Sequence, residues 1–196
     1  MIIIEERTML TFIFLSTFLL FTLLVLIPRR ASAHCDTEDG PAVLDGRKAL
    51  QTGNANHALK WILPEGDAEL RPIFDKAIKV RTLSADAADV ADRHFLENLV
   101  RIHRAGEGAS YDGIKPTGTV LDPEVVAADE AMETGNLKPL MALIPADKHS
   151  ELQRRFDKAR ALKQFDVNDL VAGRAYVAAY VSFYKFAEGE EDHHHH

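Results

Sequence analysis

The chain has 196 residues, 46% of them hydrophobic, so it is long enough and apolar enough to fold around a core. Its formal charge is −7 and it has no long basic run, which argues against a nucleic-acid partner, because binding to phosphates needs clustered Lys and Arg. A single cysteine excludes an internal disulfide framework.

The first 33 residues have the features of an export signal. Residues 9–27 form an uncharged run of 19, which ends at a proline and two arginines. Ala31-Ser32-Ala33 then supplies the small residues that signal peptidase requires, so we expect cleavage that makes His34 the mature N-terminus of a periplasmic or extracellular protein. The alternative is an uncleaved membrane anchor, since the run is long enough to span a bilayer.

The chain resembles itself at an offset of 82 residues. Residues 41–77 and 123–159 are identical at 13 of 37 aligned positions, which indicates a duplication. We therefore expect two similar helical halves. The predicted divisions are a first half at 34–105, a Gly/Pro loop at 106–120, a second half at 121–187 and an acidic, His-rich tail at 188–196.

The sequence pattern predicts four helices in each half. Pro41 and Pro123 suit a first helical turn, and Gly53 and Gly135 suit the left-handed residue that ends a helix. The remaining expected elements are short helices at 55–63 and 137–144, third helices near 68–81 and 149–163, and long fourth helices from caps at Ser84 and Asp166 to Ala105 and Ala187. No stretch alternates as a strand does, so we predict an all-α fold with both halves packed as one bundle-like domain.

The predicted mature N-terminus is the leading candidate for metal binding. The α-amine and imidazole of a terminal His34 can chelate one ion together, and Cys35 adds a thiolate. Such nitrogen and sulfur donors suit copper, nickel or zinc, and a nitrogen-rich site with one thiolate favours copper. The alternative interpretation is an incidental terminal residue in a protein without a metal.

The segment His34-Cys35-Asp36-x-x-x-Gly40 resembles the hook that opens mature nickel superoxide dismutase, which is also helical. The second cysteine of that hook falls on Asp39, so a nickel site with two thiolates cannot form within this chain. The chain also resembles an uncharacterised family of exported bacterial proteins that begin HCDTxDGP and carry an HRAGEG segment, here residues 34–41 and 103–108. That second resemblance implies a fold and export, and no established activity.

A second histidine, His103, is a candidate to complete the site. It lies about 50° from the centre of the apolar stripe of its helix, so we expect a partly buried ring. The ring has two candidate roles: a third nitrogen ligand beside His34, or a core-edge side chain bonded to a backbone carbonyl. Candidates for groups that orient these ligands are Asp36, Asp39, Glu107 and Tyr111.

Three further histidines, His57, His94 and His149, lack metal-ligand spacing and are expected at the surface. The chain contains no nucleotide loop, nucleophile elbow or His-Glu zinc motif, so a hydrolase or kinase has little support. The leading hypothesis is an exported metal-binding protein with superoxide-dismutase-like redox activity. The alternative is an extracytoplasmic scaffold that binds a protein partner through its repeats, and an oligomer is compatible with both.

Overall fold

The computed structural model describes residues 34–189. The predicted leader at 1–33 and residues 190–196 of the predicted tail lie outside this range. The contacts divide the chain after Ala31, so every described residue belongs to the unit that follows. This unit is all-helical, as predicted. Between His34 and Gly189, no helix is both long and apolar enough to cross a bilayer.

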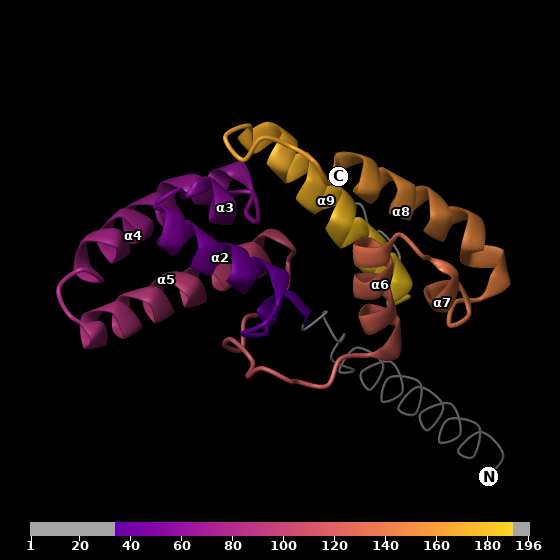
Figure 1. Ribbon diagram of the computed structural model, residues 1–196, viewed down its shortest axis with the longest axis horizontal. Helices are drawn as coiled ribbons and strands as arrows, with labels where there is room; N and C mark the ends of the chain where they lie inside the picture. The colour runs from indigo at the N-terminus through magenta and orange to yellow at the C-terminus, as the bar shows by residue number, and fades with distance from the viewer. Residues whose placement is uncertain (1–33, 190–196) are drawn as a thin grey trace, which may run out of the picture. The chain divides into compact units, whose positions relative to one another are not determined.

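The helices recur in the predicted order (Figure 1). The first half begins with the 3-10 turn η1 (His34–Asp36) and contains α2 (Pro41–Thr52), α3 (Asn56–Leu59), η2 (Pro64–Gly66), α4 (Asp67–Val80) and α5 (Ala85–Gly106). The second half contains α6 (Pro123–Thr134), α7 (Lys138–Met141), η3 (Ala146–Lys148), α8 (His149–Leu162) and α9 (Leu170–Ala187). The pairs α2/α6, α3/α7, η2/η3 and α4/α8 share the offset of 82 residues found in the sequence.

The expected helix ends follow from local chemistry. Gly53 and Gly135 end α2 and α6 with φ of 68° and 80°, a left-handed conformation that glycine adopts without a steric penalty. The third helices match their predicted bounds within one residue, whereas α3 and α7 are single turns and shorter than predicted. Pro72 lies in the second turn of α4, where it removes one backbone hydrogen bond.

The two long helices differ in how they begin. Ser84 caps α5 as predicted, because its hydroxyl accepts a hydrogen bond from the Ala87 N–H at 3.0 Å. The predicted cap at Asp166 is wrong. Asp166 instead closes a turn with the N–H groups of Asn168 and Asp169, and the Asp169 carboxylate caps α9 by accepting from Ala172 N–H at 3.0 Å.

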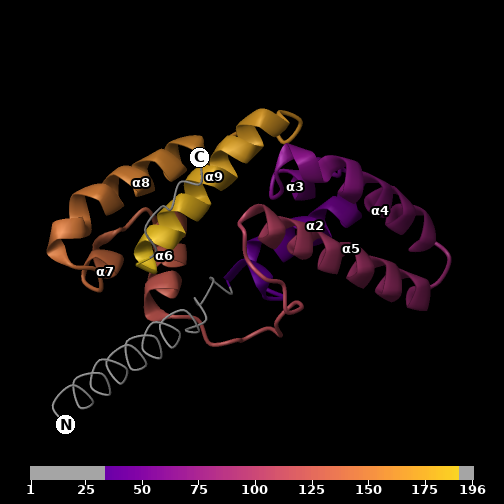
Figure 2. The same ribbon diagram turned by 180° about the vertical axis from the view of Figure 1, so that it is seen from behind.

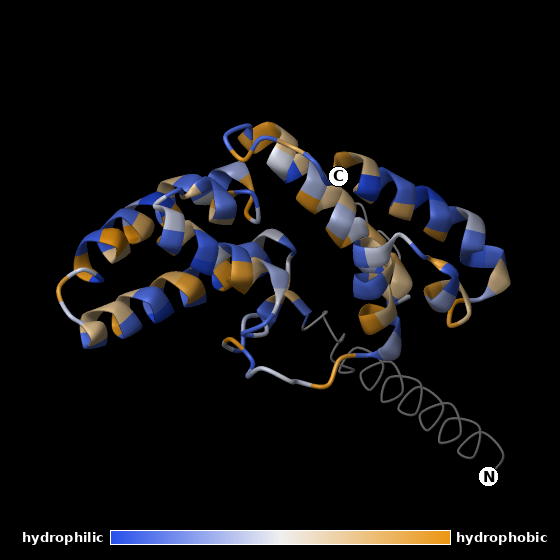
Figure 3. Ribbon diagram, in the orientation of Figure 1, coloured by the Kyte–Doolittle hydropathy of each residue, from blue (hydrophilic) through white to orange (hydrophobic). Residues whose placement is uncertain are grey.

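Each half packs its first and third helices on its long fourth helix. Helices α2 and α4 pack on α5, and α6 and α8 pack on α9 (Figures 1 and 2). Figure 3 shows mostly polar residues along α8. The buried residues of this helix are Leu152, Phe156 and Ala159, and α8 packs on α9. The fully buried large side chains at the centre of this packing are Phe95, Phe183, Leu59, Leu70, Leu99, Leu140 and Leu152.

The two halves are joined by polar and aromatic contacts. Arg174 on α9 donates to the carbonyl groups of Ile62 and Leu59 at 3.0 and 3.3 Å, and its guanidinium also contacts Asp67. The ring of Tyr180 on α9 packs edge-on against Trp61, with centroids 5.8 Å apart. These contacts make the two repeats a single packed body.

The predicted loop runs from Glu107 to Asp122 and passes beside the start of the first half. Lys115 lies opposite Thr37 in an isolated parallel β-bridge. The Lys115 N–H donates to the Asp36 carbonyl at 2.7 Å, and the Glu38 N–H donates to the Lys115 carbonyl at 2.9 Å. The loop therefore fixes residues 36–38 through their backbone.

The packing of α2 on α5 predicts a cost for a single added methyl group. A Cβ on Gly46 would lie 2.6 Å from Leu96 Cδ2 and 2.8 Å from Leu99 Cδ2, and both leucines are buried. We expect Gly46→Ala to lower the free energy of unfolding by about 1 kcal/mol, because overpacking exceeds the gain in helix propensity. Urea denaturation measures the change. Gly46→Ala should cost less in a Leu96→Ala background, and an equal cost there would contradict the steric explanation.

Candidate functional site

The His34 ring lies against the second half of the chain. It is 5% exposed and stacks on Tyr184, with ring centroids 4.9 Å apart and an interplanar angle of 9°. Its Nε2 atom lies 3.0 Å from the Tyr180 hydroxyl and 3.2 Å from Asp129 Oδ1. The Tyr184 hydroxyl donates to the same Asp129 oxygen. Helices α6 and α9 thus hold one edge of this imidazole.

This arrangement selects one tautomer of His34. A carboxylate oxygen accepts hydrogen bonds, and Nε2 lies 3.2 Å from Asp129 Oδ1, so we assign the ring proton to Nε2. In the neutral ring the other nitrogen then has a free lone pair. That atom, Nδ1, is buried and has no hydrogen-bond partner. His34 therefore has an unpaired donor, Nδ1, which is the ring nitrogen nearer to its own backbone nitrogen.

The turn that holds His34 explains the glycine in the HCDTEDGP segment. A Cβ on Gly40 would lie 2.2 Å from the His34 carbonyl oxygen and 2.9 Å from Thr37 Oγ1, so no larger residue fits. The Thr37 hydroxyl donates to the same carbonyl at 3.4 Å, and Pro41 begins α2 immediately afterwards. This close approach sets the position of His34 relative to α2.

His103 is bonded through Nδ1, the ring nitrogen that is unpaired in His34. Its ring is 3% exposed, and its Nδ1–H donates to the Trp61 carbonyl oxygen at 2.6 Å. The backbone-carbonyl partner expected for a core-edge histidine is confirmed. Burial lowers the pKa of His103, so the ring is neutral near pH 7, although Glu107 partly opposes this shift. Its Nε2 is buried without a hydrogen-bond partner and faces Glu107 Oε2 at 3.8 Å.

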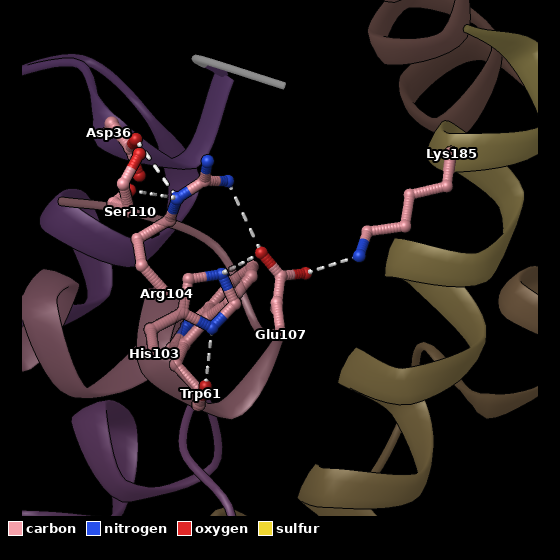
Figure 4. A network of polar contacts seen from close by, with 7 residues as sticks. All are labelled: Asp36, Trp61, His103, Arg104, Glu107, Ser110 and Lys185. Carbon is pink, nitrogen blue, oxygen red and sulfur yellow. Dashed lines mark hydrogen bonds and ion pairs between the residues drawn. The ribbon is translucent and has the colours of Figure 1, made fainter. Parts of the chain in front are cut away.

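Glu107 connects the two halves beside His103 (Figure 4). One carboxylate oxygen contacts Arg104 at 3.3 Å, and the other contacts Lys185 of α9 at 3.4 Å. Arg104 also lies 3.4 Å from Asp36 Oδ2. Lys185 occupies the repeat position that corresponds to His103, so two equivalent positions meet at one carboxylate. The HCDT and HRAGEG segments are therefore in contact.

Cys35 is buried between these groups. Burial, together with the Glu107 and Asp36 carboxylates, raises the pKa of its thiol well above the ordinary value, despite the opposing effect of Arg104. Burial also raises the pKa of Asp36 to about 6, against the lowering effect of Arg104. The thiol accordingly stays protonated near pH 7.

The other two expected orienting residues lie elsewhere. Asp39 is exposed, and its carboxylate accepts from the Gly118 N–H at 3.4 Å. Tyr111 is half-buried, with a buried hydroxyl that has no hydrogen-bond partner. Across residues 34–189, no three His, Cys, Asp or Glu side chains cluster closely enough to hold a metal among themselves.

A row of aromatic rings runs between the two histidines. Centroid distances are 6.4 Å from His34 to Tyr180, 5.8 Å from Tyr180 to Trp61, and 5.8 Å from Trp61 to His103. His34 therefore contacts the row on α9, and His103 contacts it at the end of the first half's short helix.

A comparison with family models identifies the chain. A model described as a family of unknown function, DUF6448, matches residues 39–186. The chain belongs to this family. No curated protein and no solved structure matches it. The DUF6448 match includes His103, Glu107 and Tyr111, whereas His34, Cys35 and Asp36 precede its first residue.

Several residues around the two histidines of this DUF6448 protein were not predicted from its sequence. Tyr180 and Tyr184 belong to a stripe of tyrosines four residues apart on α9, which is a visible signal for one helix face. Asp129 has no such signal, because the equivalent position of the first half is Arg47 and the carboxylate is therefore not repeated. Of the histidines expected at the surface, His94 is exposed, whereas His57 and His149 are half-buried.

Proposed function

We propose that this DUF6448 protein is exported, is cleaved before His34, and then binds one transition-metal ion through the α-amine and Nδ1 of His34. An amine and the Nδ1 of the same residue form a six-membered chelate ring with a metal, which Nε2 cannot do. The observation that carries the proposal is that Nδ1 is the unpaired nitrogen of His34, while Nε2 faces Asp129.

Two further groups are candidates for the remaining coordination positions. His103 has a neutral ring with an unpaired Nε2, which is the protonation state that a metal ligand requires. The Cys35 thiol would have to lose its proton to a bound ion, since its pKa is raised by burial. Either donor would have to move toward the His34 chelate on binding, because residues 34–189 hold no preformed cluster of three side-chain ligands.

Copper is the metal that we favour over nickel and zinc. Imidazole and amine nitrogens bind Cu²⁺ more tightly than Ni²⁺ or Zn²⁺ in the usual affinity order for divalent metals. Copper with an open position cycles between two oxidation states, so superoxide dismutation, in which two superoxide ions and two protons give O₂ and H₂O₂, is the activity to assay. Metal sequestration without catalysis uses the same ligands.

A metal titration tests the site. The protein is prepared from His34 onward, with His193–His196 replaced by serine so that the tail binds no metal. We expect one tight equivalent of Cu²⁺, followed by calorimetry and by visible absorption. Tight binding should be lost in His34→Ala and when the α-amine of His34 is acetylated, because acetylation removes the amine donor and leaves the ring.

Two matched variants sharpen this test. Asp129→Asn retains the shape of the side chain but weakens its interaction with Nε2–H, and we expect about 10- to 100-fold weaker copper binding. His94→Ala, at an exposed histidine of α5, should leave the affinity unchanged. Equal copper affinity in the acetylated protein would overturn the proposal and leave the non-catalytic scaffold as the better account.

A further inference from the structure

A cavity of about 300 Å³ lies between the two repeats. Its lining residues do not include His34 or His103, whose unpaired nitrogens belong to the proposed metal site. Its walls come from α2 and the short-helix segment of the first half, and from the 163–167 segment and α9 of the second half. Figure 1 shows α3, which contains the lining residue His57, beside the start of α9. Cavities of this size at an interface between packed units are typical of sites for small ligands.

The charges that line the cavity are mainly positive, although the chain as a whole has a charge of −7. Lys48, Lys60 and Lys163 line it, and Asp45 is the carboxylate among its lining residues. Asp45 is already neutralised, because Lys60 Nζ lies at 2.8 Å and the Trp61 indole N–H donates to it at 2.8 Å. Two ammonium groups are therefore left to attract a negative charge.

Those two lysines differ in how firmly they are held. Lys163 donates one hydrogen bond to the Met132 carbonyl oxygen at 3.0 Å, which leaves two N–H donors on its ammonium group. Lys48 lies on an exposed turn of α2 at the cavity edge, and its charge contributes to lowering the pKa of the nearby His57. Burial also lowers that pKa and is the larger cause, so His57 is a neutral ring at pH 7.

The remaining walls are aromatic. Trp61, Phe165, Tyr176 and Tyr180 line the cavity, and Phe165 and Tyr176 pack with centroids 5.6 Å apart. Burial raises the pKa of Tyr176 to about 12, so its phenol adds no negative charge at neutral pH. Flat, apolar walls with cationic groups at the rim complement a planar ring that carries an anionic substituent.

We propose that this cavity binds a small aromatic carboxylate, with its ring between the aromatic walls and its carboxylate at Lys48 and Lys163. The site does not depend on the metal proposed at His34, because none of its lysines contacts that histidine. Tyr180 is the residue common to both, since its ring lines the cavity and its hydroxyl faces His34 Nε2.

Three fluorinated probes of matched size test the proposal: 4-fluorobenzoate, 4-fluorobenzyl alcohol and 4-fluorobenzylamine. The protein is prepared from His34 onward, in the presence of a metal chelator. Trp61 is the single tryptophan of the chain and lies in the cavity wall, so its fluorescence reports occupancy, and ¹⁹F line broadening reports binding of the probe. We expect 4-fluorobenzoate to bind more tightly than the alcohol and the amine to bind most weakly.

Charge variants locate the binding site. Lys48→Gln and Lys163→Gln should each weaken 4-fluorobenzoate binding roughly fivefold, while Lys76→Gln, on the exposed face of α4, should have no effect. His34→Ala should bind the probe as the parent does, which separates this site from the metal site. Equal binding of all three probes, an equal effect of inorganic phosphate on Trp61, or full binding in both lysine variants would overturn the proposal.

Discussion

Replacing Arg104 with methionine should lower the free energy of unfolding by about 3 kcal/mol at pH 8, because it removes the cation from a buried charge network. Arg104 is 4% exposed and contacts both Asp36 and Glu107. Glu107 keeps Lys185 as a partner, whereas Asp36 loses its nearest cation. The variant must then bury an uncompensated carboxylate or bind a proton to it.

The effect should depend on pH in a defined direction. Folding raises the pKa of Asp36 to about 6, so its contribution to stability is present at low pH and is lost as the pH rises through 6. Without Arg104 that pKa rises further, and the loss extends to higher pH. At pH 5 Asp36 is largely protonated in both proteins, so the difference between them should shrink.

Urea unfolding with a metal chelator at pH 5 and pH 8 measures this difference. Arg101→Met is the matched control, since Arg101 lies on the same helix with a side chain 40% exposed and pairs with Glu69 at the surface. We expect that control to cost less than about 1 kcal/mol at either pH. An equal loss at both pH values for Arg104→Met would mean that packing, and not the Asp36 charge, accounts for the destabilisation.

Replacing Phe183 with alanine should cost about 3–5 kcal/mol, because the side chain is fully buried and its removal leaves a cavity. Its ring lies 5.6 Å from the ring of Phe156 and 5.6 Å from that of Tyr184. Phe186→Ala provides a control on the same helix, since Phe186 is only partly buried, and its cost should be smaller.

The Phe183 variant also tests whether the two repeats unfold together. Phe183 belongs to the second half, whereas Trp61 belongs to the first and packs on Tyr180 of the second, so its fluorescence reports on the first half and on the contact between the halves. We expect the urea midpoints from Trp61 fluorescence and from far-ultraviolet circular dichroism to shift by the same amount. A shift in circular dichroism with an unchanged Trp61 midpoint would show that the halves unfold independently.

Most of the fold could be predicted from the sequence, because the duplication places the same helix-starting and helix-ending residues in both halves. Pro41 and Gly53 bound one helix, and Pro123 and Gly135 bound its counterpart, so each pair supports the other. The prediction of the α9 cap at Asp166 failed, because several polar residues precede this helix. Asp166 forms a turn with Asn168, which leaves Asp169 as the cap. Duplication also hides differences: Phe74 and Phe156 are equivalent, yet they pack on Phe95 and Phe183, which are not.

The candidate site was predictable only for the groups that carry their own signal. A histidine after a cleavage motif and a histidine near an apolar stripe stand out in a sequence, and both are buried with one unpaired ring nitrogen. The groups that fix these rings are a carboxylate on α6, two tyrosines on α9 and one backbone carbonyl. Their roles follow from tertiary packing across the two halves, which periodicity within one helix does not encode.

The β-bridge between Thr37 and Lys115 holds the backbone next to the proposed N-terminus. Chain ends are ordinarily the most mobile parts of a domain. Here hydrogen bonds hold the backbone of residues 36–38, two residues beyond His34. Cleavage at the predicted site would therefore expose an end that has already lost most of its conformational entropy on folding. A donor pair in that state gives up little further freedom when it captures a ligand, which favours tight binding by a short segment.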